Sequence, residues 1–322
     1  NEIHNNKNFF FQQLSCLTAN QSNIAGSFLT STSQSFYNKF SNKEFSTLLC
    51  LRYNLDLDYI PTNLPCTCNR INKITGIKQP SIIDKKGFHI CNACNADACP
   101  TIIHDAVQNV FAQAFKNAGC HVVNKPSVED ADGKLLVPDH LVLGNGTESG
   151  QGLMVDYRHT DSGQTNPLDF SEHMLKSDTE KIGKYNAAVS RSGHRFMPII
   201  LDKFGNVLQK TRDMLFQMFI RKVSNDRHDI TETETDFIAT KKTNFWLKRA
   251  SAAMAKTKAI CIINRSTKLI AIQHEKKHGK GSKNSSTYFD YRIDIEQESD
   301  VLIADYSFDE CNYFKEDDDI CA

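Results

Sequence analysis

Two aspartates stand in the middle of apolar, strand-like runs between Leu136 and Arg158. Asp139 lies in LLVPDHLVL and Asp156 in GLMVDYR, with a glycine-rich connection between the runs. Burying a carboxylate is costly unless an opposite charge compensates it. If the runs pair as a hairpin, a divalent cation between the carboxylates would turn their repulsion into attraction. Mg²⁺ held in this way can polarise a phosphoryl oxygen and activate water, the chemistry of phosphodiester hydrolysis. The alternative is that Asp139 is a turn residue after Pro138 and that Asp156 ends a strand.

A second constellation is a cluster of cysteines. Five of the eleven cysteines lie between residues 66 and 99: Cys66, Cys68, Cys91, Cys94 and Cys99. An odd total with one tight cluster argues against a disulfide framework and favours an intracellular metal site. Three thiolates and an imidazole suit tetrahedral Zn²⁺, and the candidate ligands are Cys66, Cys68, His89 and either Cys91 or Cys94. We favour Cys94, because its spacing from His89 leaves room to wrap the ion, and we expect a structural site. Buried free cysteines are the alternative.

The net charge of zero hides an asymmetry along the chain. Residues 241–283 hold twelve Lys and Arg and one acid, whereas residues 289–322 hold two bases and twelve acids. A basic body suits a polyanionic partner, and the acidic tail is expected to be disordered. The candidate phosphate contacts are Arg191, Arg195 and the basic segment, with Lys248 and Arg249 beside Phe245 and Trp246. Those aromatic rings could stack on bases or fill a helix core, and for Trp246 we favour the core.

Hydrophobic periodicity predicts the elements that position these residues. It indicates a helix over 101–119, strands over 120–125, 134–143 and 151–158, a helix around 178–192 and a strand over 194–201. This αβββαβ order would bring the two aspartate-bearing strands side by side. His104 opens the first helix and could reach the aspartates, although a core or surface position is the more common fate of such a histidine. Helices are also expected within 1–60 and over 207–224 and 244–264, and a flexible basic linker over 275–286.

Composition bounds the class of protein. A hydrophobic content of 40% and a charged content of 24% are ordinary for a soluble globular protein. The sequence contains no run of 18 apolar residues, so we expect no membrane span. The chain begins NEIHNNKNFFFQQL, without an initiator Met or the layout of a secretory signal, which favours a fragment of a longer protein.

The order of these features resembles a known family. A Cys-Cys-His-Cys cluster precedes a helix, PD stands on one strand, an aspartate follows on the next, and a helix then carries KIGKY. This combination is similar to the restriction-like endonuclease domain at the C-terminal end of many non-LTR retrotransposon proteins, which belongs to the PD-(D/E)xK nuclease superfamily. The likeness covers roughly residues 24–268. It implies an α/β (α+β) fold, with a restriction-endonuclease-like αβββαβ core, a small zinc-binding module and flanking helices.

The resemblance also implies roles for single residues. Cys66, Cys68, His89 and Cys94 match the zinc cluster, and Asp139 and Asp156 match the ligands of a catalytic Mg²⁺ or Mn²⁺. Lys184, with Lys181 one turn before it, matches the helix lysine of the family, and Tyr185 follows it. The chain departs from the family at DYR, where DVT is frequent. Arg158 therefore stands where the superfamily motif has Lys, and an arginine could clamp a phosphate but not act as a base.

The predicted organisation has five parts: a helical segment 1–60, a zinc cluster 61–100, the nuclease core 101–205, C-terminal helices 206–270, and a linker with the acidic tail over 271–322. The resemblance implies a Mg²⁺-dependent DNA endonuclease that acts in the nucleus or elsewhere inside the cell, with DNA and the RNA of a mobile element as partners. A decayed or domesticated nuclease that binds nucleic acid without catalysis is the alternative. Lys181 or Lys184 beside the aspartates would favour the enzyme, whereas Arg158 pairing with both would favour the binding module.

Overall fold

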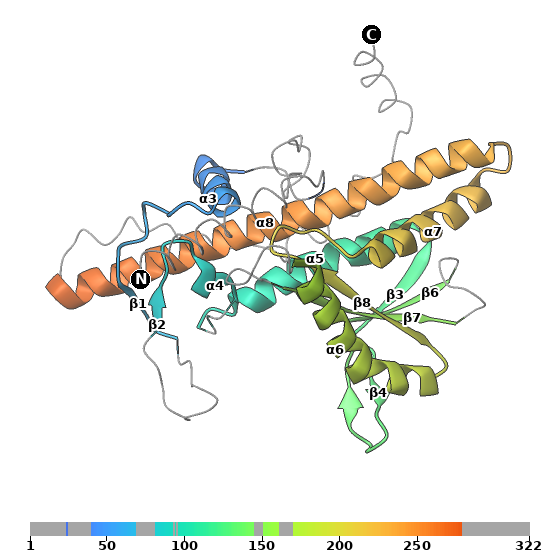
Figure 1. The fold of residues 1–322 in the computed structure, drawn as a ribbon, viewed down its shortest axis with the longest axis horizontal. Helices are drawn as coiled ribbons and strands as arrows, with labels where there is room; N and C mark the ends of the chain where they lie inside the picture. The colour runs from blue at the N-terminus through green and yellow to red at the C-terminus, as the bar shows by residue number, and fades with distance from the viewer. Residues whose placement is uncertain are drawn as a thin grey trace, which may run out of the picture. The chain divides into compact units, whose positions relative to one another are not determined.

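The computed structural model is a mixed α/β structure (Figure 1). It describes residue 24 and residues 40–68, 81–92, 94, 96–144, 151–160 and 170–278. Within these ranges no helix is both long and apolar enough to cross a lipid bilayer. The acidic tail expected over 289–322 lies outside the described residues.

The central sheet has four strands in the order β3-β6-β7-β8. They are β3 (Cys120–Asn124), β6 (His140–Gly144), β7 (Leu153–His159) and β8 (Arg195–Leu201). The β3–β6 and β6–β7 pairs are antiparallel, and the β7–β8 pair is parallel. A parallel pair needs a crossover, which the chain makes through α6 (Phe170–Arg191). The elements follow the predicted order except within residues 134–143, and α6 begins earlier than expected.

Helices cover both faces of the sheet, as Figure 1 shows for α6 on one face and α5 (Cys99–Asn117) on the other. Successive side chains of a strand point to opposite faces. On β7, Tyr157 therefore packs against Phe111 of α5, with ring centroids 5.5 Å apart. Met154 instead joins a core with Tyr185 and Val189 of α6. Asp156 shares the parity of Met154, so its side chain faces α6.

The strand expected over 134–143 is two strands. Leu135–Leu136 (β5) pairs with Val128–Glu129 (β4) in a separate hairpin, and β6 begins only at His140. Pro138 lies at the break, because a proline has no N–H for a ladder bond. The break places Asp139 directly before the first residue of β6. There its amide donates to the Val155 carbonyl at 3.0 Å.

The segment before α5 contains the elements of the cysteine cluster. They are the helix α3 (Asn42–Tyr53), the paired strands β1 (Leu64–Cys66) and β2 (Ser81–Ile83), and the short helix α4 (Phe88–Asn92). A capping box between Ser41 and Glu44 begins α3. On α3, Leu48 is buried, whereas Phe45 is 37% exposed.

Two helices follow β8. The helix α7 (Gln209–Asp226) agrees with the prediction, but α8 spans Glu232–His278, much more than the expected 244–264. Residues 275–278 are therefore helical rather than part of a linker. Figure 1 shows α7, α5 and α3 packed at different points along α8. A helix that is covered on different sides along its length has no single apolar stripe, which explains why periodicity predicted only its middle.

Candidate functional site

Asp139 and Asp156 lie at adjoining positions of the β6–β7 pair. His140 is paired with Val155 in the ladder, so Asp139 comes next to Asp156. The Tyr157 amide donates to Asp139 Oδ2 at 2.8 Å, which holds that carboxylate over the β7 backbone. The side chains of Asp139 and Asp156 are 15% and 6% exposed. The two carboxylates are therefore neighbours, as expected, at the N-terminal end of β6.

The surroundings of Asp139 and Asp156 shift the pKa values of the two carboxyl groups in opposite directions. Burial raises the pKa of Asp139, but hydrogen bonds from His104 and the Tyr157 amide, with the charges of His104 and Lys181, bring it below its ordinary value. Burial also raises the pKa of Asp156, and Lys181 offsets this only in part, so that the pKa stays above its ordinary value. The charge of Asp139 adds to that rise. The charge of Lys181 therefore favours the ionised form of Asp156.

The lysine in contact with the carboxylates is Lys181. Its Nζ lies against Asp156 Oδ2 across the space between α6 and β7. Lys184, the residue that matches the family lysine, is exposed and donates to the Tyr185 hydroxyl at 2.7 Å. Tyr185 is buried, and burial together with the charge of Asp156 raises its pKa to about 12. Of the two lysines, Lys181 is therefore the one placed to act on Asp156.

His104 reaches the same place from α5. Its Nε2 lies 3.3 Å from Asp139 Oδ1, and this hydrogen bond raises the pKa of the imidazole. The histidine is half-buried and lies beside Tyr157, with ring centroids 6.2 Å apart. His104 therefore contacts Asp139, as one of the two expectations for this residue required.

Beneath the aspartates is a polar network that the sequence did not indicate. His140 Nδ1 lies 2.9 Å from the Tyr157 hydroxyl, and His140 Nε2 lies 3.3 Å from Gln108 Nε2. His140 is 1% exposed, and burial lowers its pKa to about 4. The signal available in the sequence was a histidine directly after the PD pair in an otherwise apolar run.

Arg158 does not lie between the aspartates. Its Nη1 donates to Glu180 Oε2 at 2.6 Å, and both side chains are largely exposed. This ion pair holds the guanidinium on the outer part of α6, next to Lys181. Arg158 remains available at the rim of the carboxylate site, where it could contact a phosphate.

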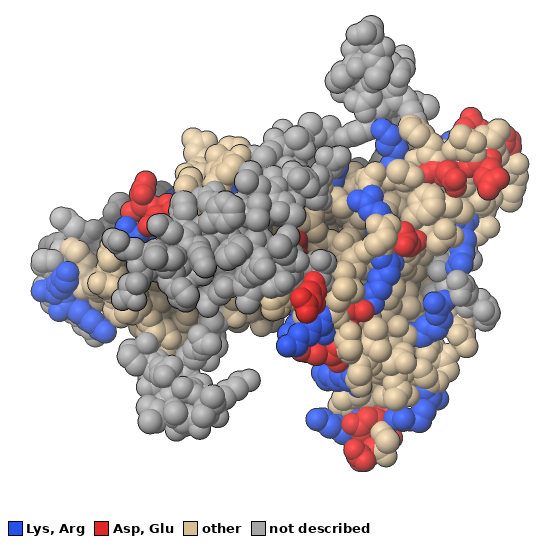
Figure 2. Space-filling model, in the orientation of Figure 1, with Lys and Arg blue, Asp and Glu red and all other residues tan. Residues whose placement is uncertain are grey.

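The other predicted phosphate contacts are dispersed. Arg191 donates to the Glu129 carbonyl at 3.1 Å, and Arg195 and Lys248 are exposed. Arg249 is 6% exposed with its guanidinium 5.6 Å from the ring of the half-buried Trp246, so it belongs to the packing of α8. Further bases of the 241–278 segment are also buried: Lys256, Lys258 and Arg265. Figure 2 shows the Lys and Arg side chains of this face in separate groups, several of them beside Asp or Glu.

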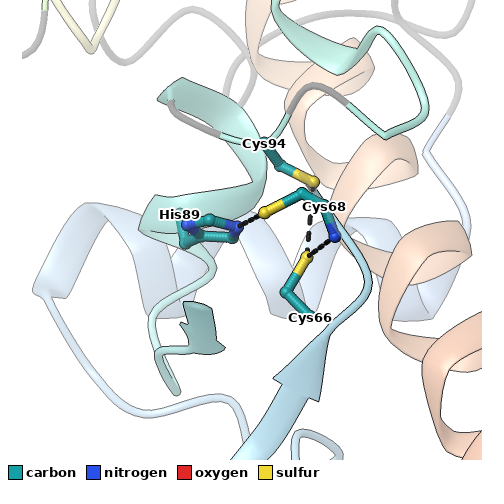
Figure 3. Close-up of side chains that lie close together, drawn as sticks. All are labelled: Cys66, Cys68, His89 and Cys94. Carbon is teal, nitrogen blue, oxygen red and sulfur yellow. Dashed lines mark hydrogen bonds between the residues drawn. The ribbon is translucent and has the colours of Figure 1, made fainter. Parts of the chain in front are cut away.

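The cysteine cluster brings together the four predicted ligands (Figure 3). Cys66 Sγ lies 3.6 Å from Cys94 Sγ, and Cys68 Sγ lies 3.3 Å from His89 Nε2. Within the described ranges, these residues form the one group of three or more Cys, His, Asp or Glu side chains whose ligand atoms all lie within 4.8 Å of one another. Cys91 is instead buried in the hydrophobic core, which confirms the choice of Cys94.

The donor set and its spacing fit zinc. Tetrahedral bonds of about 2.3 Å to sulfur place two sulfurs roughly 3.8 Å apart, close to the separations in this cluster. The candidate ligands come from two elements that are separated by β2: Cys66 ends β1, and His89 lies on α4. Asp84 begins α4 by accepting from the Phe88 amide at 2.9 Å and the His89 amide at 2.7 Å. This cluster can therefore bind a metal such as Zn²⁺ as a closed, four-ligand site.

Comparison with models of protein families gave no match, and no curated protein matches the sequence. Function is therefore inferred from the residues and their geometry.

Proposed function

We propose that this chain is a metal-dependent endonuclease that hydrolyses phosphodiester bonds of DNA. The observation that carries the proposal is the group formed by Asp139 and Asp156 on adjoining strands, Lys181 against Asp156, and His104 against Asp139. Two paired carboxylates suit a hard divalent cation, and a nearby lysine suits a phosphate.

The arrangement of elements supports a restriction-endonuclease-like core. A helix, three antiparallel strands, a crossover helix and a parallel strand follow one another as in the superfamily that the sequence resembles. Asp139 directly precedes the second of these strands, Asp156 lies on the third, and Lys181 lies on the crossover helix, close to the order that the resemblance implies. The β4–β5 hairpin is an addition between the first two of the three strands.

The proposed mechanism assigns a task to each residue. Asp139 and Asp156 would hold Mg²⁺ or Mn²⁺, which supplies charge for the leaving oxygen and activates water. His104 keeps the Asp139 carboxylate oriented and charged through its hydrogen bond. Lys181 stabilises the negative charge of the phosphate, and in the absence of a metal it neutralises Asp156. Arg158, at the rim, contacts a phosphate of the same strand.

Partner and location follow from the same proposal. DNA is the proposed substrate, RNA of a mobile element is a second partner, and action in the nucleus is the corresponding location. The position of Arg158 favours the enzyme over the non-catalytic binding module, because Arg158 pairs with Glu180 and leaves the aspartates to Lys181.

The test is nicking of supercoiled plasmid in Mg²⁺ and in Mn²⁺. We expect the unaltered protein to nick it, and Asp139→Ala and Asp156→Asn to reduce the rate by about 10²–10³-fold, since each removes a charge-stabilising group. Asp156→Asn preserves the shape of the side chain, so DNA binding should survive. If the unaltered protein binds the plasmid but leaves it intact in both metals, the endonuclease proposal fails and the binding module replaces it.

A further inference from the structure

Arg265 of α8 reaches into the cysteine cluster from 199 positions along the chain. Its Nη2 donates to Cys66 Sγ at 3.4 Å and to Thr67 Oγ1 at 2.9 Å. Its Nη1 donates to Asp97 Oδ2 at 2.6 Å. The side chain is only 2% exposed. A guanidinium buried to this extent requires negative charge around it.

Asp97 alone does not supply that charge. Lys268, one turn further along α8, shares the same carboxylate, with Nζ 2.8 Å from Asp97 Oδ1. The second anionic group within reach of Arg265 is the sulfur of Cys66. Three thiolates around one Zn²⁺ leave an excess negative charge on the cluster. A metal-loaded cluster would therefore place a net negative charge beside the buried guanidinium of Arg265.

We propose that Arg265 is the charge partner of the metal-loaded cluster, and that metal binding thereby fastens α8 to the cysteine cluster. Arg265 acts as a positioning residue, because it touches the ligand Cys66 and not the metal. This inference rests on the metal site alone and is independent of the proposed nuclease activity.

A second contact joins α8 to the other half of the cluster. Gly87, just before the helix that carries His89, lies so close to Ile262 that a Cβ at Gly87 would come within 2.7 Å of Ile262 Cδ1. Ile262 and Arg265 are three residues apart, so they lie on the same face of α8. One face of α8 thus contacts the Cys66 side of the cluster through Arg265 and the His89 side through Ile262. Displacing either half would loosen the same stretch of helix.

The first experiment uses the unaltered chain. Amide hydrogen exchange is followed with Zn²⁺ bound and after removal of Zn²⁺ by a chelator. We expect faster exchange in 255–275 together with 81–97 after removal, while β6 and β7 keep their protection. Unchanged protection of 255–275 in the metal-free protein would overturn the proposal, since α8 would then be held without the metal.

The second experiment measures zinc affinity by competition with a chromogenic chelator. Removing a residue that holds a metal ligand commonly reduces affinity about 10–100-fold, and we expect this loss for Arg265→Met. Arg265→Lys keeps the charge but not the forked contacts, so its affinity should fall between those of the unaltered protein and Arg265→Met. Lys268→Met is the matched control, because Lys268 shares Asp97 but is 59% exposed and bonds no ligand sulfur; it should bind zinc with nearly unchanged affinity.

Equal zinc affinity in the unaltered protein and Arg265→Met would refute the role of the arginine. Equal losses in Arg265→Met and Lys268→Met would assign the effect to general charge and also refute it. If Arg265→Met does not fold, Arg265→Lys and the exchange experiment on the unaltered chain decide between the outcomes.

Discussion

The two aspartates of the carboxylate site have different environments although both are largely buried. Asp139 accepts hydrogen bonds from His104 and a backbone amide, and its pKa is low. Asp156 depends on Lys181 to offset its burial, and its pKa is high. Environments that separate the pKa values of paired groups are frequent at active sites. Asp139 is therefore the more acidic of the two carboxyl groups, and the neighbouring Lys181 favours the charged form of Asp156.

Lys181 and Lys184 form a matched pair for testing the catalytic lysine. Lys181→Met removes the cation in contact with Asp156, and we expect the nicking rate to fall by about 10²-fold. Lys184→Met removes a lysine from the same helix that contacts only the Tyr185 hydroxyl, so the loss should be much smaller. Rates on supercoiled plasmid in Mg²⁺ provide the comparison. A larger loss from Lys184→Met would return the catalytic role to the residue that matches the family motif.

The His104–Asp139 pair predicts a pH dependence of stability in metal-free protein. The raised pKa of His104 means that its contribution is complete below the ordinary value of 6.5 and is lost as the pH rises through the folded-state pKa. The lowered pKa of Asp139 means that its contribution is complete above the ordinary value of 3.8 and is lost as the pH falls through its folded-state pKa. Removing the pair should therefore cost most between these values.

We expect His104→Ala to lower the free energy of unfolding by about 1.5–3 kcal/mol at a pH near 5.5, as for a hydrogen bond to a charged group. The difference should shrink at alkaline pH, where the imidazole is neutral in both states. Urea unfolding in the presence of a chelator at the two pH values measures this. An equal difference at both would show that His104 stabilises the fold by packing alone.

Short elements position the residues of the cysteine cluster, and the long helix α8 packs against these elements. The β1–β2 hairpin and α4 present the four ligands, and Asp84 fixes the start of α4 through two backbone amides. Neither a short hairpin nor a helix of one turn is stable by itself. Packing against α8 therefore supplies stability that these elements lack, and a metal in the proposed site would add to it.

Substitutions of Cys94 and of Cys91 test which of the two cysteines completes the proposed ligand set. Cys94→Ser removes a ligand atom, so we expect it to lose most of the bound zinc, because zinc prefers thiolate ligands. Cys91→Ser changes a side chain within the apolar core and should retain about one Zn²⁺ per chain. Elemental analysis of protein purified without chelator gives the ratio. Equal zinc contents in both variants would remove Cys94 from the ligand set.

Gly87 tests the contact between α4 and α8. Gly87 has φ +68° and no room for a Cβ beside Ile262, whereas Gly133 has φ +75° and open space. Both Ala substitutions strain the backbone, but only Gly87→Ala adds a clash, which should cost about 1–3 kcal/mol more than Gly133→Ala. Chemical unfolding of the two variants measures the difference. Ile262→Ala removes the side chain that clashes, so Gly87→Ala should cost less in the Ile262→Ala background than in the unaltered protein, and an equal cost in both backgrounds would place the clash elsewhere.

At the scale of the whole chain, the elements around the cysteine cluster (β1, β2 and α4) and the central sheet share one hydrophobic core. Leu64, Ile83 and Ile90 belong to the same buried cluster as Phe111 and Val155. The long helix α8 contributes to this cluster along much of its length, and several of its basic side chains are buried as a result. The basic segment is therefore in part a component of the core, and only some of its charges can meet a polyanion.

Salt dependence of DNA binding separates the exposed bases from the buried ones. Lys248 is exposed and Lys256 is 4% exposed. If Lys248 contacts a phosphate, Lys248→Gln should reduce the slope of log affinity against log salt by about 0.9. Lys256→Gln should leave the slope unchanged, provided that circular dichroism shows an intact fold. Equal slopes for Lys248→Gln and the unaltered protein would exclude Lys248 from the DNA surface.

The sequence determined the elements and the ligand types. Short apolar runs between turn-rich connections located the strands of the central sheet, whose two faces are both covered by helices, and helical spacing located α5, which buries one face against the core. The four residues of the cysteine cluster were also predictable, since thiolates and an imidazole in a polar stretch have few other uses. The break at Pro138 had a local signal, because a proline cannot donate a ladder bond. The full length of α8 had none, because it depends on neighbours that are distant in the sequence.

The tertiary structure decided which charged side chains meet. Lys181 and Lys184 differ by three residues on one helix, and only the position of α6 over β7 selects Lys181 for Asp156. The contact between Arg265 and Cys66 likewise depends on the path of α8 past the cluster. Pairing of charges acts over a few ångströms and is set by packing between elements. A sequence therefore specifies the groups that are available, whereas the assembled core specifies their partners.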